Sequence, residues 1–222
     1  MQYLYNIDSG KDSIVIQGDS YRYLFKVRRL NSDSILELRN LKDKNLYLYR
    51  VVSIDKKSAT LALIGSEEKE VKPAKDLTIG WCIIDPKIIE KNIASLNEIG
   101  VSKIVFIKCA YSQANFKITQ DRLNKILINS SQQCGRSSLM SLEFSNSIAD
   151  FLRQYPNSYL LDFSETKLES NLDINSIVIG CEGGISKDER ALFKQEKTVG
   201  LNTPQILKSE SAAISVAAKI LL

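Results

Sequence analysis

The apolar positions in residues 1–70 fall into short runs. Residues 14–16, 35–38, 46–52 and 59–63 are rich in aliphatic and tyrosine side chains and are bounded by Gly, Asp, Asn and Lys. Such runs predict short strands at close spacing, which is typical of a small β-barrel. We therefore expect a β-rich domain in this part of the chain.

A charged segment, residues 66–76, separates these runs from a second pattern. It contains Pro73 and few apolar side chains, so it is expected to be a linker. The chain is therefore predicted to consist of one domain over residues 1–70 and a second over residues 71–222.

The second domain alternates short apolar runs with stretches of helical periodicity. Strands are expected at residues 81–84, 103–108, 159–161 and 176–179. Helices are expected at residues 86–99, 118–134, 145–155 and 209–222. Strands that alternate with helices predict an α/β fold with a largely parallel sheet.

The last quarter of the chain places a strand, a glycine turn and a helix start in succession. Residues 177–179 are apolar, and glycines fill much of residues 180–184. Ser186 and Glu189 then have the Ser-x-x-Glu spacing of a capping box. A second glycine turn at residues 199–201 and a helix of small residues follow. Glycine lets bare backbone approach a ligand, so these pieces together predict one backbone-lined pocket.

The amino-acid composition limits which catalytic groups and metal sites the protein can contain. The 222 residues include no histidine, which removes the usual general base and the Ser-His and Cys-His nucleophile systems. No two cysteines form a CxxC pair, so no metal site is expected. Scattered cysteines fit a reducing compartment. Cys181 lies in the glycine loop, either as a reactive thiol or as an ordinary loop residue.

Basic residues gather at one place in the first domain. Arg22, Lys26, Arg28 and Arg29 have no acidic residue among them and are interleaved with tyrosine and phenylalanine, in a chain of net charge +4. Basic side chains with aromatic neighbours suit an RNA backbone and its unstacked bases. A solvated face over a small core would give the same pattern.

The sequence gives no sign of a membrane protein. No apolar run reaches the roughly 20 residues of a membrane-spanning helix. The first residues also lack the basic-then-apolar pattern of a signal peptide. A cytoplasmic protein is expected.

Four blocks together resemble a known family. In chain order, residues 97–101 read Asn-Glu-Ile-Gly-Val, residues 133–136 Gln-Cys-Gly-Arg, residues 180–186 Gly-Cys-Glu-Gly-Gly-Ile-Ser and residues 206–212 Ile-Leu-Lys-Ser-Glu-Ser-Ala. They resemble the RsmE family of SPOUT methyltransferases. Its blocks read Thr-Glu-Leu-Gly-Val, Gln-Cys/Ser-x-Arg, Gly-Pro-Glu-Gly-Gly-Phe-Ser and Ile-Leu-Arg-Thr-Glu-Thr-Ala. The resemblance extends over essentially the whole chain.

The resemblance implies both a fold and an activity. The fold would be a C-terminal SPOUT domain with a trefoil knot, preceded by a PUA-like β-barrel that binds RNA. The activity would be methylation of N3 of a specific uridine in 16S ribosomal RNA, with S-adenosyl-L-methionine as cofactor. A cytoplasmic homodimer acting on the small ribosomal subunit, in ribosome biogenesis, is then expected.

Methyl transfer asks the protein mainly to position the cofactor and substrate. By resemblance, the three loops of the last quarter and a neighbouring strand end would line the cofactor pocket. The expected cofactor-binding residues are Leu160, Ile179, Gly180, Glu182, Gly183, Gly184, Gly200, Leu201, Ile206, Leu207 and Ser211.

Two residues are expected to carry the chemistry. By resemblance, Arg136 would lie near the methyl acceptor, in its own subunit or across a dimer interface. Its guanidinium would stabilise the negative charge that deprotonation of uridine N3 spreads onto O2 and O4. The alternative for Arg136 is a surface residue at a helix end. Glu210 would accept the N3 proton or, alternatively, cap the last helix.

The sequence departs from the family pattern at Tyr23, Ser95, Gln132, Cys181 and Lys208. Two alternatives therefore stay open: a SPOUT methyltransferase acting on another ribosomal or transfer RNA site, and an inactive RNA-binding ribosome assembly factor. A small-molecule enzyme is disfavoured, because the chain has neither a Walker loop nor a GxGxxG fingerprint.

Overall fold

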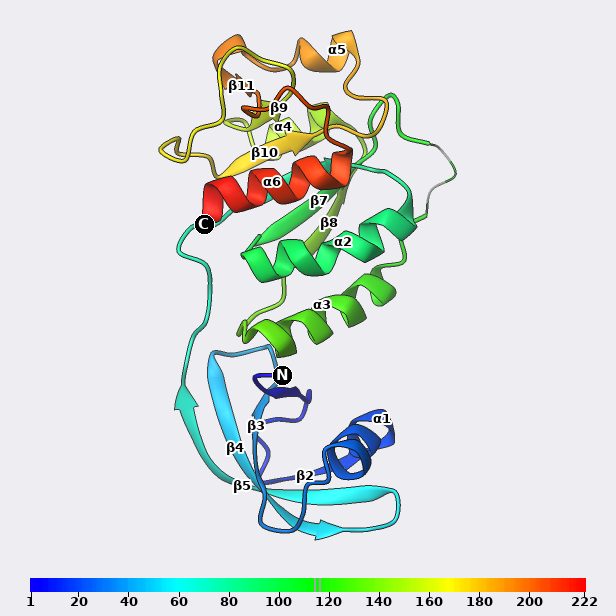
Figure 1. Cartoon of the computed structure of the whole chain (residues 1–222), viewed down its shortest axis with the longest axis vertical. Helices are drawn as coiled ribbons and strands as arrows, with labels where there is room; N and C mark the ends of the chain where they lie inside the picture. The colour runs from blue at the N-terminus through cyan, green and yellow to red at the C-terminus, as the bar shows by residue number, and fades with distance from the viewer. Residues whose placement is uncertain (114, 116) are drawn as a thin grey trace. The chain divides into compact units, whose positions relative to one another are not determined.

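The computed structural model describes residues 1–113, 115 and 117–222. The chain folds into two compact units, each with its own hydrophobic core (Figure 1). The first unit comprises residues 1–72 together with residues 131–138, and the second comprises residues 73–130 and 139–222. Residues 131–138 thus belong to the first unit, although they lie beyond the domain boundary predicted near residue 70.

The first unit is built on a five-stranded sheet in the order β1-β3-β4-β5-β2. Its strands are β1 (Leu4–Tyr5), β2 (Ser13–Gln17), β3 (Ile35–Arg39), β4 (Asn45–Ile54) and β5 (Ser58–Glu68). β1 pairs with β3 in parallel, and the other pairings are antiparallel. The four predicted apolar runs lie in β2 to β5, whereas β1 is too short to give a pattern.

The linker expected from residue 66 begins later than predicted. Residues 66–68 belong to β5, where Glu67 and Glu68 pair with Leu46 and Asn45 of β4. Charged side chains are tolerated there because this end of the strand is exposed. The prediction of a linker was therefore wrong for these residues.

The second unit contains a six-stranded sheet in the order β11-β9-β10-β6-β7-β8. Its strands are β6 (Thr78–Cys82), β7 (Lys103–Ile107), β8 (Ser141–Ser145), β9 (Tyr159–Leu161), β10 (Ser176–Ile179) and β11 (Thr198–Val199). Each pairing described in this sheet is parallel. The predicted α/β fold with a parallel sheet is confirmed.

Among the described residues, five α-helices accompany this sheet: α2 (Pro86–Ile99), α3 (Gln120–Cys134), α4 (Ile148–Gln154), α5 (Lys187–Arg190) and α6 (Ser209–Leu221). A 3-10 turn, Gln195–Lys197, precedes β11. The bounds of α2 follow local signals, since the Asp85 carboxylate accepts from the Lys87 amide at 2.8 Å and Gly100 takes φ 114°. In the described part of the chain, no helix is both long and apolar enough to cross a membrane.

One predicted helix begins in the wrong place. A helix starting at Ser145 was expected, but Ser145 ends β8, where it pairs with Ile107. The helix cap is Ser147, whose hydroxyl accepts from the Asp150 amide at 3.0 Å, and α4 follows. The competing strand was missed because β8 is only partly buried and carries polar side chains.

The last helix belongs to the core of the second unit. α6 lies alongside α2 (Figure 1), and Val216, Ala217 and Ile220 are buried in that core. Packing within the unit accounts for these three residues.

Candidate functional site

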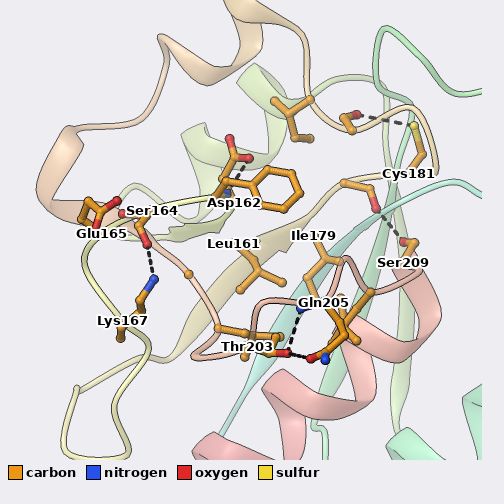
Figure 2. A pocket seen from close by; sticks show the side chains of 18 residues that line it. Leu161, Asp162, Ser164, Glu165, Lys167, Ile179, Cys181, Thr203, Gln205 and Ser209 are labelled. Atoms are coloured by element: carbon orange, nitrogen blue, oxygen red, sulfur yellow. Dashed lines mark hydrogen bonds between the residues drawn. The ribbon is translucent and has the colours of Figure 1, made fainter.

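A cavity lies at one edge of the parallel sheet. β9, β10 and β11 are parallel, so their carboxyl ends meet at this edge, where ligands commonly bind in such sheets. The loops after Leu161, Ile179 and Val199, together with the start of α6, line a cavity of about 410 Å³ (Figure 2). This volume is in the range of small-molecule sites.

The predicted pocket residues divide into two groups. Those that line the cavity are Ile179, Gly180, Gly184, Gly200, Leu201 and Leu207. Those outside its lining are Leu160, Glu182, Gly183, Ile206 and Ser211. The side chain of Leu160 is fully buried in the core, and the next residue, Leu161, lines the cavity instead. Ile206 is 80% exposed, whereas Leu207 beside it faces inward.

Sequence reasoning missed one wall of the cavity. This wall is the loop that follows β9 and contributes Asp162, Phe163, Ser164, Glu165 and Lys167. The signal was available, because residues 159–161 were predicted as a strand and the carboxyl ends of parallel strands share an edge. Other lining residues that were not predicted are Leu161, Cys181, Ile185, Thr203, Gln205, Ser209 and Ala212.

Gly200 fastens two of these loops together. Its amide donates to the Thr166 carbonyl at 2.8 Å, and its carbonyl accepts from the Leu168 amide at 2.8 Å. A Cβ atom at Gly200 would lie 2.8 Å from the carbonyl oxygen of Ser164, which belongs to the rigid backbone of the facing loop. Only glycine permits this close approach.

Ser209 fastens the glycine loop after β10 to the start of α6. Its hydroxyl donates to the Gly180 carbonyl at 2.5 Å and accepts from the indole Nε1 of Trp81 at 2.9 Å. Trp81 is fully buried. The predicted capping box is also present, with Ser186 and Glu189 bonded reciprocally at the start of α5. The glycine loop is therefore held at both ends.

Replacement of Ser209 by alanine is expected to lower the free energy of unfolding by about 1–3 kcal/mol, because a buried indole N–H and a carbonyl lose their partner. Urea denaturation followed by circular dichroism measures this change. The control is Ser215→Ala on the same helix, where a change within about 0.5 kcal/mol is expected. Equal effects of the two substitutions would contradict the role given to Ser209.

Two of the charged groups at the cavity have polar partners. Asp162 has a side chain that is only 9% exposed, and its carboxylate pairs with Nε of Arg190 at 2.5 Å. The Lys167 ammonium donates to the Ser164 carbonyl at 2.9 Å. Hydroxyl, carboxylate and backbone groups thus lie beside the apolar side chains of Leu161 and Ile179 (Figure 2).

The two expected catalytic residues lie outside the lining of this cavity. Glu210 is in the first turn of α6, next to Ser209, which does line it. In the described part of the chain, the buried Oε2 of Glu210 has no hydrogen-bond partner. Arg136 is buried in the segment that packs with the first unit, where its carbonyl accepts from the Tyr3 hydroxyl at 2.7 Å. Arg136 is therefore not the surface residue that the alternative described.

The basic cluster of the first unit lies on a short, irregular helix and on the two residues that follow it. α1 (Gly18–Tyr21) continues into a π-helix, Arg22–Val27, whose Leu24 and Phe25 are buried in the core. The basic cluster, Arg22, Lys26, Arg28 and Arg29, is exposed. Arg29 also adopts φ 56°, a left-handed backbone conformation that is costly for residues other than glycine. π-Helices and such backbone outliers are frequent at functional sites.

Comparisons with known proteins identify the chain. Residues 70–221 match the family model of an RNA methyltransferase domain, and residues 16–64 match an RNA methyltransferase PUA domain. A protein of Helicobacter pylori (strain ATCC 700392 / 26695), "Ribosomal RNA small subunit methyltransferase E", is 40% identical over 98% of each chain. The chain belongs to this methyltransferase E family. The family predicted from the four sequence blocks, and the PUA-like domain expected with it, are confirmed.

A more distant relative carries the same name, and a solved structure shares the fold. The methyltransferase E of Rickettsia conorii is 28% identical over 90% of this chain and 85% of its own. A crystal structure of the methyltransferase E from Neisseria gonorrhoeae, bound to S-adenosyl methionine, has a TM-score of 0.73 at 15% identity. It covers 98% of this chain and 95% of its own, so the shared fold includes both domains.

Proposed function

We propose that this protein transfers a methyl group from S-adenosyl-L-methionine to N3 of a specific uridine in the 16S ribosomal RNA of the small subunit. The observation that carries the proposal is the cavity at the carboxyl edge of β9, β10 and β11. Its glycine-containing loops and apolar side chains suit a nucleoside cofactor. The names of the relatives and the cofactor in the Neisseria structure support the choice of ligand.

The residues of the cavity fit such a cofactor. Gly200 lets the loop after β9 pack closely against the loop after β11, and Leu161, Ile179 and Leu207 offer apolar surface to an adenine ring. Asp162 offers a carboxylate to hydroxyl or ammonium hydrogens. When bound, the cofactor supplies an activated methyl group, and the protein supplies position and exclusion of water.

The protein must also remove a proton from the uridine. We assign this step to Glu210, because its Oε2 is without a hydrogen-bond partner among the described residues and can accept the N3 proton. The charge then delocalises onto O2 and O4 of the base. Arg136, from the same subunit or from the partner in a homodimer, is proposed to stabilise that charge.

The first unit is proposed to hold the RNA. Its exposed basic cluster would neutralise phosphates, and Tyr23, which is 42% exposed, would offer a surface to an unstacked base. In this account residues 1–70 bind RNA and residues 71–222 perform the reaction, in a cytoplasmic homodimer that acts during ribosome biogenesis.

Loss of the basic cluster should change how RNA binding depends on salt. For the double variant R28A/R29A, the slope of log K against log salt is expected to become shallower by about one for each lost phosphate contact. Fluorescence anisotropy with a 16S ribosomal RNA fragment at several salt concentrations measures this slope. The control K56A/K57A removes the same charge from the exposed turn after β4 and should change it less. Equal slopes for the two variants would show that the cluster has no special role.

The experiment that tests the function uses purified protein, S-adenosyl-L-methionine with a radiolabelled methyl group, and small subunits from a strain lacking the gene. Label in the 16S ribosomal RNA is expected, with more from assembled subunits than from naked RNA. Label in transfer RNA or in another ribosomal RNA instead would show that the enzyme has a different substrate. RNA binding without cofactor binding would indicate an inactive assembly factor.

A further inference from the structure

Three cysteines lie together behind the cavity. Cys109 and Cys181 are each the second residue beyond the carboxyl end of a strand, β7 and β10 respectively, and β6 between them ends at Cys82. The Sγ atoms of Cys109 and Cys181 are 3.6 Å apart, although the residues are separated by 72 positions in the chain. All three thiols are buried, and none has a role in the proposed reaction.

Cys181 connects this cluster to the cofactor site. It lines the cavity, among the residues labelled in Figure 2, and it lies between two other lining residues, Gly180 and Gly184. A small oxidant that enters the cavity therefore meets Cys181 at the wall, and the sulfur of Cys109 lies 3.6 Å behind it. A hydroperoxide is small enough for a cavity of about 410 Å³.

We propose that Cys109 and Cys181 are a redox modification site, at which a hydroperoxide produces an intramolecular disulfide that weakens binding of S-adenosyl-L-methionine. In the first step the Cys109 sulfur attacks an oxygen of the hydroperoxide, giving a sulfenic acid and, from hydrogen peroxide, one water. In the second step the Cys181 sulfur attacks that sulfenic sulfur and the second water leaves. Two thiols are oxidised, the peroxide O–O bond is reduced, and a dithiol restores the pair by exchange.

The surroundings favour Cys109 as the first nucleophile. Hydrogen bonding with Cys181 and Cys82 holds the pKa of the Cys109 thiol well below its ordinary value. Its sulfur also lies 3.1 Å from the Ser112 hydroxyl. The thiolate is the reactive form of cysteine, and the neighbouring Cys181 is placed to resolve the sulfenic acid.

Formation of the bond would displace the glycine loop. A disulfide has an S–S length of about 2.05 Å, so the sulfurs must approach by roughly 1.5 Å. Cys181 cannot follow freely, because its carbonyl accepts from the Gly184 amide at 2.9 Å and the preceding Gly180 carbonyl is held by Ser209. Movement of Cys181 would therefore also displace Gly180 and Gly184, which line the cavity. By linkage, bound cofactor should oppose disulfide formation to the same extent.

The test uses the full chain in a Cys134→Ser background, which removes the exposed fourth cysteine. The protein is treated with hydrogen peroxide, digested without reduction and examined by mass spectrometry, and its affinity for S-adenosyl-L-methionine is measured by calorimetry. We expect a peptide cross-linked through Cys109 and Cys181, an affinity at least tenfold weaker after oxidation, and full recovery with dithiothreitol. Saturating cofactor should slow the appearance of the cross-link.

Control variants make the result specific. In Cys109→Ala, and separately in Cys109→Ser, peroxide should leave the variant's own starting affinity unchanged. A cross-link between Cys82 and Cys109, sulfinic acids without a cross-link, or a disulfide that leaves the affinity unaltered would each overturn the proposal. The effect on affinity rests on the proposed function. Lack of cofactor binding by the reduced protein would overturn both the proposed function and the effect on affinity. The cross-linked peptide would still support formation of the disulfide.

Discussion

Replacement of Glu210 by glutamine is expected to lower the rate of methyl transfer by about 10²- to 10⁴-fold, the usual contribution of a positioned general base. Glutamine keeps the shape of the side chain but cannot accept the N3 proton. Affinity for S-adenosyl-L-methionine should stay within about twofold, because Glu210 does not line the cavity. Single-turnover methylation of small subunits, with calorimetry of cofactor binding, measures both quantities.

The alternative role of Glu210, a favourable charge at the start of α6, predicts a different result. Loss of that charge would lower the free energy of unfolding by about 0.3–1 kcal/mol and leave the rate nearly unchanged. Glu98→Gln is a suitable control, since Glu98 is exposed on α2 and accepts a hydrogen bond from Ser130. A rate for E210Q equal to that of E98Q would remove Glu210 from the mechanism.

Replacement of Gly200 by alanine is expected to weaken cofactor binding by about 5- to 150-fold. The added Cβ would lie 2.8 Å from the Ser164 carbonyl oxygen and 3.2 Å from that of Asp162, so the two loops must separate. Overpacking of this kind costs about 1–3 kcal/mol, and here the strain falls on a wall of the cavity. Calorimetry with S-adenosyl-L-methionine measures the loss.

The matched control for this substitution is Gly65→Ala in β5. There the only atom within 4 Å of the added Cβ is a leucine methyl group at 3.9 Å, so the side chain meets no obstruction. Cofactor affinity should be unchanged in G65A. An affinity in G200A equal to that of the parent protein would show that the cofactor binds elsewhere.

Elements with local signals could be predicted from the sequence. The bounds of α2 follow from Asp85, Pro86 and Gly100, and the start of α5 follows from a capping box, because each signal acts within one turn of chain. β9 and β10 were also placed correctly from their apolar runs. The parallel sheet then follows from the alternation of strands and helices.

Features that depend on distant parts of the chain could not be read in the same way. The association of residues 131–138 with the first unit arises from contacts such as that between Tyr3 and Arg136, which no local pattern records. The proximity of Cys109 to Cys181 depends on the strand order β10-β6-β7, which periodicity does not give. Similarly, Leu160 was expected to line the pocket and Leu161 lines it instead, because pattern alone does not say which face of a short strand meets the cavity.

The proposed reaction produces 3-methyluridine in 16S ribosomal RNA. The most direct measurement is mass spectrometry of nucleosides from small subunits that were incubated with the protein and S-adenosyl-L-methionine, using subunits from a strain lacking the gene. We predict a 3-methyluridine signal that depends on both protein and cofactor. Methylation at another atom or base, or unmodified RNA despite demonstrated cofactor binding, would contradict the assignment.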